Sequence, residues 1–253
     1  MIIKTLRGYF VLRYYRTSDE VTEESRNIEK IASEMLNNCP DTLKRKKLLR
    51  AILGARCNLA DHLRNQNKCE EALHIFSSSI DEVEQLEDEL FKDMWLKHIT
   101  FTLMKLKREE QIVEAIQMLQ KQIEWANNAG EWRRLAAAFH HLGEAKTLLS
   151  DHASGVDRHQ ILLDAEAAFK KAVEWDICML RPRYIGWDYR ELATVYYRLA
   201  REGLDGINVE DYLTLARNSV LEALPRLEQF NNITDDVVAL AKDLDVKYPI
   251  RTD

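Results

Sequence analysis

The sequence predicts an all-α fold, a right-handed superhelical solenoid of about eleven antiparallel helices with no strands. Residues that break helices are scarce, with only 8 glycines and 4 prolines among 253 residues. Leu, Ala, Glu, Lys and Arg, which favour helix, are abundant. One helix–turn–helix pattern also recurs about four times along the chain, which is typical of a repeat array.

The first copy of this pattern lies in residues 57–79, CNLADHLRNQNKCEEALHIFSSS. Two small residues, Ala60 on its first helix and Ala72 on its second, let the two helices approach closely. Leu63 and Phe76 are large enough to fill the space around that contact. The stretch therefore predicts a closely packed helix pair.

Three further copies follow, and the first and second helices of each pair are called helix A and helix B. The place of Ala60 is taken by Leu103, Gly143 and Ala193, and that of Ala72 by Ala115, Ala165 and Ala216. The two places are 12 residues apart in the first two copies but 22 and 23 apart in the last two. The added residues predict insertions at 151–158 and 203–208, in turns within a hairpin that line one edge of the solenoid.

The pattern of aromatic, Leu and small residues on helix A, with Ala, Phe and Ala on helix B, resembles the tetratricopeptide repeat (TPR) superfamily. The resemblance covers roughly residues 56–224. The long spacing is similar to that of kinesin light chains and of bacterial signalling or defence sensor arrays. The resemblance implies one TPR-like domain over 1–253, with N-terminal helices in 1–55, four hairpins in 56–224 and a capping helix in 225–253.

The flanking segments are predicted to complete the array. Apolar residues at helical spacing predict a helix over 20–36 that stops near Pro40. Residues 43–55 continue into the first copy as one long helix. Near the other end, 233–246 is expected to form the capping helix, with Thr234 as its N-cap and acidic residues in its first turn.

Charge and cysteine content limit the class of protein. The formal net charge is −6, so the chain lacks the basic field that nucleic-acid binding requires. The four cysteines form no C-x-x-C pair and fit reduced thiols. Charged residues interrupt the first 16 residues, unlike a signal peptide, and no run approaches the roughly 18 apolar residues of a membrane span. We expect a cytoplasmic protein without membrane or nucleic-acid partners.

The resemblance implies that the helices A line a concave groove that binds a protein or peptide. Basic and aromatic side chains suit such a segment, because Arg and Lys pair with carboxylates and rings bury apolar area. The predicted partner-binding residues are Arg64, Lys97, Lys107, His140, Glu144, Arg183, Tyr184, Trp187, Arg190 and Tyr197. Cys57, Asp61, Thr100, Met104 and Thr194 are predicted on the same face. The alternative at each position is a solvated helix face.

The function predicted on this basis is a non-catalytic interaction module: an adaptor, sensor or regulatory subunit that binds near the third and fourth copies. A sensor for a peptide or small ligand is the alternative, and a small-molecule substrate is not expected. Asn58 and Lys97 match two positions of the family's carboxylate clamp. Phe101 stands where that clamp needs Arg, so a C-terminal carboxylate ligand is not inferred.

Two local clusters of residues have competing interpretations. The aromatic and basic stretch 181–191 is a candidate hot spot for a partner, or a loop in which Tyr184 and Trp187 pack on the preceding hairpin. The basic stretch 44–50 could be a nuclear signal or an anion-binding patch. Apolar residues beneath it favour a solvated helix face instead.

A metal site was weighed around the histidines of the third copy. His141 and Glu144 are three residues apart on a helix, a usable geometry for a metal. His140 and His141, however, leave a helix about 100° apart, and His152 and His159 fall in a predicted loop. The sequence therefore predicts neither a metal nor another cofactor.

A catalytic alternative is a ribonuclease of the all-α HEPN class, which uses an Arg and a His separated by four to six residues on a helix. Arg56 with His62 and Arg134 with His140 have this spacing. The His would act as general base and the Arg would stabilise phosphate charge. Both pairs lack the polar residue that usually follows the Arg, so the sequence predicts that the chain is not an enzyme.

Overall fold

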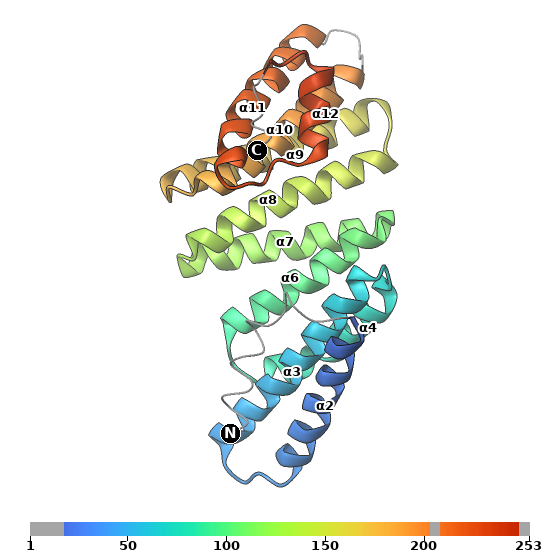
Figure 1. The fold of residues 1–253 in the computed structure, drawn as a ribbon, viewed down its shortest axis with the longest axis vertical. Helices are drawn as coiled ribbons and strands as arrows, with labels where there is room; N and C mark the ends of the chain where they lie inside the picture. The colour runs from blue at the N-terminus through green and yellow to red at the C-terminus, as the bar shows by residue number, and fades with distance from the viewer. Residues whose placement is uncertain (1–17, 203–207, 248–253) are drawn as a thin grey trace. The chain divides into compact units, whose positions relative to one another are not determined.

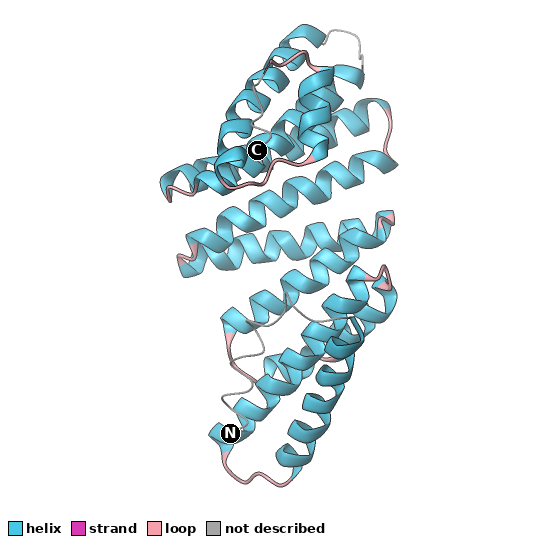
Figure 2. Cartoon of the chain, viewed as in Figure 1, coloured by secondary structure: helices cyan, strands magenta, loops and turns pink. Residues whose placement is uncertain are grey.

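The computed structural model of the protein describes residues 18–202 and 208–247, which form helices joined by short loops (Figure 2). These ranges contain eleven α-helices, α2 to α12, with one short 3-10 helix and no strand. The chain forms two compact units, 1–106 and 107–253. Within each unit the helices pack mainly on their neighbours in the chain, as in a solenoid. The predicted all-α solenoid is confirmed, and the prediction of one domain over 1–253 stays a prediction.

The N-terminal unit, 1–106, contains α2 (Ser18–Asn37), α3 (Thr42–Asn65), α4 (Cys69–Ser78), α5 (Ile80–Glu84) and α6 (Glu89–Leu106) (Figure 1). As predicted, α2 ends before Pro40. Asp41 then caps α3, because its side chain accepts a hydrogen bond from the backbone N–H of Lys44 at 2.9 Å. The unbroken α3 confirms the long helix that was predicted to continue into the first copy.

Aromatic packing anchors helix B of the first copy, α4. Phe76 is fully buried and meets Trp95 of α6 edge to face, with ring centroids 5.3 Å apart. The indole N–H of Trp95 also donates to the backbone oxygen of Phe76 at 3.0 Å.

Arg56 of α3 bonds to Glu29 of α2 at 2.7 Å and to Glu82 of α5 at 2.6 Å. These ion pairs join three helices around the aromatic core.

The C-terminal unit, 107–253, contains α7 (Glu109–Ala129), α8 (Trp132–Leu149), α9 (Gly155–Cys178), α10 (Pro182–Glu202), α11 (Val209–Gln229) and α12 (Asp235–Asp243). From α7 to α12 each helix packs on the next (Figure 1). Pro182 is the first residue of α10, where its fixed φ and missing N–H suit a helix start. Thr234 precedes α12 in the predicted N-cap position, although its side chain accepts no capping hydrogen bond.

The predicted insertion loop at 151–158 is wrong. Residues 150–152 form a 3-10 helix and α9 begins at Gly155. The inserted residues therefore lengthen α9 at its N-terminal end instead of forming an edge loop. Nearly all of the second predicted insertion, 203–208, lies outside the described residues.

Ion pairs tie the inserted residues 151–158 to α10. Asp151 pairs with Arg198 at 2.7 Å, and Arg158 pairs with Glu202 at 2.9 Å. Deleting the segment would break both pairs. The inserted residues therefore contribute contacts to the fold.

The small residues at the helix crossings provide a test of the repeat pattern. Ala165 of α9 and Ala193 of α10 are both 0% exposed. Replacing either with Leu should lower the free energy of unfolding by about 1–3 kcal/mol, because the larger side chain has no space. Ala167, on the exposed side of α9, is the matched control, and its replacement by Leu should change stability by less than about 0.5 kcal/mol. Urea unfolding would measure the free energy of unfolding of all three variants. Equal losses at 165 and 167 would contradict the assignment of Ala165 to a helix crossing.

Candidate functional site

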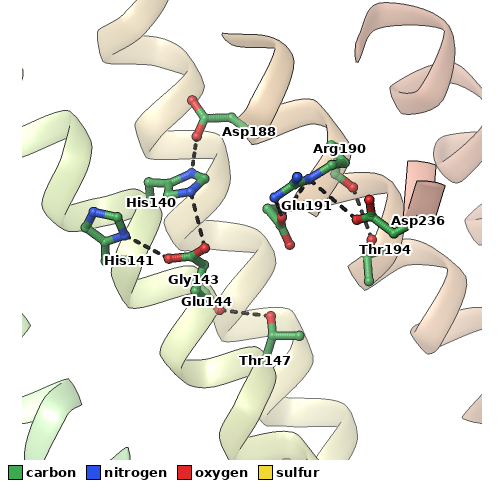
Figure 3. Close-up of polar contacts among 10 residues, drawn as sticks. All are labelled: His140, His141, Gly143, Glu144, Thr147, Asp188, Arg190, Glu191, Thr194 and Asp236. Carbon is green, nitrogen blue, oxygen red and sulfur yellow. Dashed lines mark hydrogen bonds and ion pairs between the residues drawn. The ribbon is translucent and has the colours of Figure 1, made fainter. Parts of the chain in front are cut away.

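A largely buried polar cluster joins α8 and α10 in the C-terminal unit (Figure 3). The Nδ1 atom of His140 on α8 lies 2.6 Å from Oδ1 of Asp188 on α10. Its Nε2 atom lies 3.6 Å from Oε1 of Glu144, one turn further along α8. The Nδ1 atom of His141 lies 2.8 Å from Oε2 of the same glutamate. We call His140, His141, Glu144 and Asp188 the α8 cluster.

The repeat pattern explains why these residues meet. His140 lies three residues before Gly143, the small residue of helix A in the third copy, and Glu144 lies one residue after it. Asp188 lies five residues before Ala193, the small residue of the fourth copy. The two helices A, α8 and α10, are in contact, so these three places face one another across the helix pair.

The same three places carry a second polar cluster in the N-terminal unit. They are occupied by Cys57 and Asp61 of α3 and by His98 of α6, which we call the α3 cluster. Nδ1 of His98 lies 2.8 Å from Oδ1 of Asp61. The guanidinium NH2 of Arg64 also contacts this carboxylate oxygen, at 2.9 Å. A histidine–carboxylate contact between successive helices A is therefore a recurring feature of this chain.

Arg190 extends the polar network of the C-terminal unit to its last described helix. Its guanidinium is bonded to Glu191, with Nε 2.9 Å from Oε1. Nε also lies 4.0 Å from Oδ2 of Asp236, in the first turn of α12 (Figure 3). The hydroxyl of Thr194 donates to the backbone oxygen of Arg190 at 3.2 Å. Arg190 thus lies at ion-pair distance from the first turn of α12.

A second buried carboxyl group, that of Asp176 on α9, neighbours Asp188. Asp176 and Asp188 are 4% and 1% exposed, and, besides burial, the charge of Asp188 contributes to the raised pKa of Asp176. Arg181 balances part of this charge, because its NH1 donates to Oδ1 of Asp176 at 2.9 Å.

Burial and charge shift the pKa values in the network. Burial disfavours the imidazolium of His140, but hydrogen bonds to Asp188 and Glu144 outweigh it and raise the pKa of His140 to about 10. Burial opposes ionisation of Glu144, yet hydrogen bonds from the two imidazoles lower its pKa. Burial raises the pKa of Asp188 and of Glu191, and it raises that of Asp176 to about 6. At neutral pH the α8 cluster therefore contains a charged His140.

Aromatic residues of α10 flank the cluster. The guanidinium of Arg183 lies 4.7 Å from the ring centroid of Trp187, which packs half-buried against the core. Tyr184 meets Trp187 edge to face at 5.3 Å and keeps 40% of its surface exposed. Further along the helix, Tyr197 is half-buried, with Arg201 5.7 Å from its ring centroid. These residues form what we call the aromatic strip of α10.

The structure places seven of the ten predicted partner-binding residues on α8 and α10. These are His140, Glu144, Arg183, Tyr184, Trp187, Arg190 and Tyr197. Arg64 and Lys97 belong to the N-terminal unit, where they lie 5.8 Å and 5.2 Å from the ring centroid of Phe101. Lys107 is exposed in the turn before α7, with a φ of 54°. Contact of these residues with a partner stays a prediction.

Four other residues predicted on the groove face are buried, which corrects the expectation that they are accessible. Cys57, Asp61, Thr100 and Met104 are 7%, 1%, 1% and 8% exposed. Packing between α3 and α6 explains the burial of Asp61, since His98 of α6 bonds to its carboxylate. The sequence prediction also missed the acidic residues Asp188, Glu191 and Asp236. The signal available for Asp188 was its place in the repeat, which is equivalent to that of His98.

The basic stretch 44–50 makes ion pairs at its own surface. Lys46 pairs with Glu87 at 2.6 Å, and Arg50 pairs with Asp88 at 2.8 Å. Both acidic residues precede α6, so these pairs connect the start of α3 with the turn before α6. The contacts favour a structural role for the stretch.

The residues considered for a nuclease have structural partners. Arg56 is held by acidic residues of α2 and α5, and Nε of Arg134 lies 4.0 Å from Glu131. His140 lies between Asp188 and Glu144. The absence of enzymatic activity stays a prediction.

Comparisons with known proteins define the fold. No family model matches the sequence, and a comparison with curated protein sequences finds no match. The structure is similar to the crystal structure of BtubC (BKLC) from P. vanneervenii, with a TM-score of 0.54 and 10% sequence identity over 94% of this chain and 96% of that chain. Among the described residues, no helix is both long and apolar enough to cross a membrane. The architecture and this likeness together show a helical repeat fold.

Proposed function

We propose that the protein is a non-catalytic interaction module of the TPR type that binds a protein or peptide segment along α8 and α10. The series of small and aromatic residues supports the TPR assignment, and the long spacing supports repeats like those of kinesin light chains. A cytoplasmic adaptor, sensor or regulatory subunit fits these features and the four free cysteines.

The observation that carries the proposal is the aromatic strip of α10 beside the α8 cluster. Trp, Tyr and Arg are the residue types most enriched in binding hot spots. Trp187, Tyr184 and Tyr197 keep part of each ring accessible while the rest is packed. A partner can therefore bury the remaining aromatic area at a low cost in side-chain entropy.

The structure changes which cation is best placed to meet an acidic partner group. Arg190 is already bonded to Glu191 and lies close to Asp236. Arg183 is exposed, and its polar contact with Asn232 is long, at 3.4 Å. We therefore expect Arg183, stacked on Trp187, to contact a carboxylate of the partner.

The double variant Trp187→Ala with Arg183→Ala should weaken partner binding by about 2 kcal/mol or more, a factor of about 30. It should also melt earlier, because Trp187 packs on the core. Affinity and melting should be measured on the same sample, well below the melting temperature. The control is Leu221→Ala, at an exposed position of α11. Normal affinity of the folded double variant would overturn the site assignment.

Affinity purification with the whole chain as bait, followed by mass spectrometry, tests the proposed function. A stable protein partner that the double variant fails to retain supports the adaptor role. A co-purified peptide or small ligand supports the sensor alternative. RNA cleavage that is lost in His62→Ala or His140→Ala would overturn both.

A further inference from the structure

We propose that the α8 cluster is a binding site for a divalent transition-metal ion of the zinc class. The ligands are Nε2 of His140, Nδ1 of His141 and a carboxylate oxygen of Glu144. Two imidazoles and one carboxylate are a donor set that such ions accept. The inference concerns the chain alone and does not depend on the proposed partner.

The three ligand atoms converge although two of them come from adjacent residues. The imidazole rings of His140 and His141 lie at 79° to each other, with centroids 5.2 Å apart. Each ring directs one nitrogen at Glu144 (Figure 3), at 3.6 Å from His140 and 2.8 Å from His141. All three ligand atoms lie within 4.8 Å of one another. The separation of about 100° between adjacent helical side chains, which argued against a metal, is thus overcome by the side-chain conformations.

These spacings are close to those that a bound ion imposes. Zinc ligands at about 2.0–2.1 Å in a tetrahedron lie about 3.3 Å from one another. Nε2 of His140 lies 3.6 Å from Oε1 of Glu144, and Nδ1 of His141 lies 2.8 Å from Oε2. These distances bracket that value for a carboxylate that can ligate through either oxygen. The side chains of His140, His141 and Glu144 are 14%, 16% and 31% exposed, so an ion can reach the site from solvent and a water molecule can complete the coordination.

Asp188 is placed to orient the first ligand. Metal-bound histidines usually donate their second ring N–H to a carboxylate, which fixes the tautomer. Oδ1 of Asp188 lies 2.6 Å from Nδ1 of His140, and Asp188 is 1% exposed. The neutral imidazole would thereby keep its proton on Nδ1, so Nε2 would present its lone pair on the side of Glu144. Asp188 is a positioning residue and not a ligand.

The charge around the cluster also favours a cation. The neighbouring carboxyl groups are those of Glu144, Asp176, Asp188 and Glu191, and the fixed cations are Arg181 and Arg190. A divalent ion would supply the positive charge while both imidazoles are neutral. Because imidazoles bind a metal only in their neutral form, the apparent affinity should rise with pH.

The α3 cluster differs in one respect that makes it a useful control. It offers Cys57, Asp61 and His98 at equivalent places, within the same 4.8 Å limit. Arg64, however, contacts Oδ1 of Asp61 at 2.9 Å, so a metal bound there would face a guanidinium on its own ligand. The charge that an ion would provide is already supplied by this arginine. We therefore place the metal in the α8 cluster.

The experiment is a titration of the chelator-treated full-length chain with Zn²⁺, in competition with a chromophoric chelator. Co²⁺ replaces Zn²⁺ in a parallel titration, because its visible absorption reports the coordination geometry. The ligand variants are His141→Gln and Glu144→Gln, the positioning variant is Asp188→Asn and the matched control is His98→Gln. Circular dichroism confirms that each variant is folded.

We expect one tightly bound ion in the wild type, with an intense tetrahedral Co²⁺ spectrum, and binding that is tighter at pH 8 than at pH 6. Asp188→Asn should weaken binding about 10- to 100-fold, and each ligand variant at least as much. His98→Gln should bind like the wild type. No binding by the wild type, unchanged binding by the folded His141→Gln variant, or loss in His98→Gln alone would each overturn the proposal. If Glu144→Gln does not fold, His141→Gln decides, because its imidazole lies at the margin of the cluster.

Discussion

Replacing Asp188 with alanine is expected to lower the free energy of unfolding by about 3–5 kcal/mol at pH 7 in the presence of a chelator. Asp188 is 1% exposed and lies 2.6 Å from Nδ1 of His140. Its removal leaves a largely buried imidazolium whose remaining carboxylate, Glu144, is 3.6 Å away. Breaking one side of a buried pair is costly because the other charge stays behind. Asp176 would lose a neighbouring carboxyl group, which offsets part of the loss.

The effect of Asp188→Ala should depend on pH in a direction that the pKa of His140 fixes. Folding raises this pKa from 6.5 to about 10. A group whose pKa is raised stabilises the fold fully below its unfolded pKa, and this stability is lost as the pH rises through the folded pKa. The wild type should therefore lose stability between about pH 6.5 and pH 10. The Asp188→Ala variant should lose less stability over this range. The difference in the free energy of unfolding between the two proteins should therefore become smaller toward pH 10.

Asp236→Ala is the matched control for this prediction. Asp236 belongs to the same network, but its side chain is 65% exposed and 4.0 Å from Arg190. Its replacement should cost less than about 1 kcal/mol. Urea unfolding of the three proteins at pH 7 and pH 10, followed by circular dichroism, measures both effects. An equal loss for Asp188→Ala at the two pH values would mean that His140 is neutral in the folded protein.

The helices could be predicted from the sequence because each one buries a regular apolar stripe. The long α3 and the crossings at Ala165 and Ala193 follow from that periodicity. The segment 151–158 was misassigned because the longer spacing between Gly143 and Ala165 shows that residues are added but not whether they form a loop or a helix. In the structure, Ser154 is the N-cap position of α9 and Gly155 is its first residue. The added residues therefore extend a helix, an outcome that spacing alone does not distinguish from a longer loop.

The candidate site was predictable only in part, because its halves are far apart in the sequence. His140 and Glu144 are four residues apart on one helix, so their proximity follows from helical geometry. The partner carboxylate of His140 comes from Asp188, 48 residues away. The apolar periodicity does not predict a buried aspartate at position 188. A comparison of the copies would have indicated it, because the equivalent place in the second copy holds another polar residue, His98. Burial of Asp61 likewise depends on contacts between helices that periodicity does not specify.

Replacing Phe169 with alanine is the second change expected to have a large effect, with a loss of about 3–5 kcal/mol in the free energy of unfolding. Phe169 of α9 is 0% exposed. Its ring packs over Gly143 of α8 and meets the ring of His140 at 5.6 Å. Truncation removes this buried area and leaves a cavity between α8 and α9, which are rigid helices and can close it only in part.

The close approach of Phe169 to Gly143 supplies a second mutation that tests the same contact. Alanine in place of glycine inside a helix usually stabilises a protein by about 0.5–1 kcal/mol. A Cβ added at Gly143 would lie 2.7 Å from the ring of Phe169. Gly143→Ala should therefore destabilise the protein by about 1–3 kcal/mol. A Cβ added at Gly54 of α3 would meet no neighbouring atom within 4 Å. Gly54→Ala is therefore the control and should stabilise the protein by about 0.5–1 kcal/mol.

The two positions can then be combined in a double-mutant cycle. Once Phe169 is alanine, the ring that collides with a Cβ at 143 is gone. Gly143→Ala should then stabilise the protein, because it regains helix propensity and fills part of the cavity. The sign of the Gly143→Ala effect should thus reverse between the two backgrounds, which is a coupling that independent sites do not show. Urea unfolding of the two single variants, the double variant and the wild type measures this coupling. An equal loss from Gly143→Ala in both backgrounds would show that Phe169 does not pack over Gly143, and the helix crossing of the third copy would then have to be assigned to other residues.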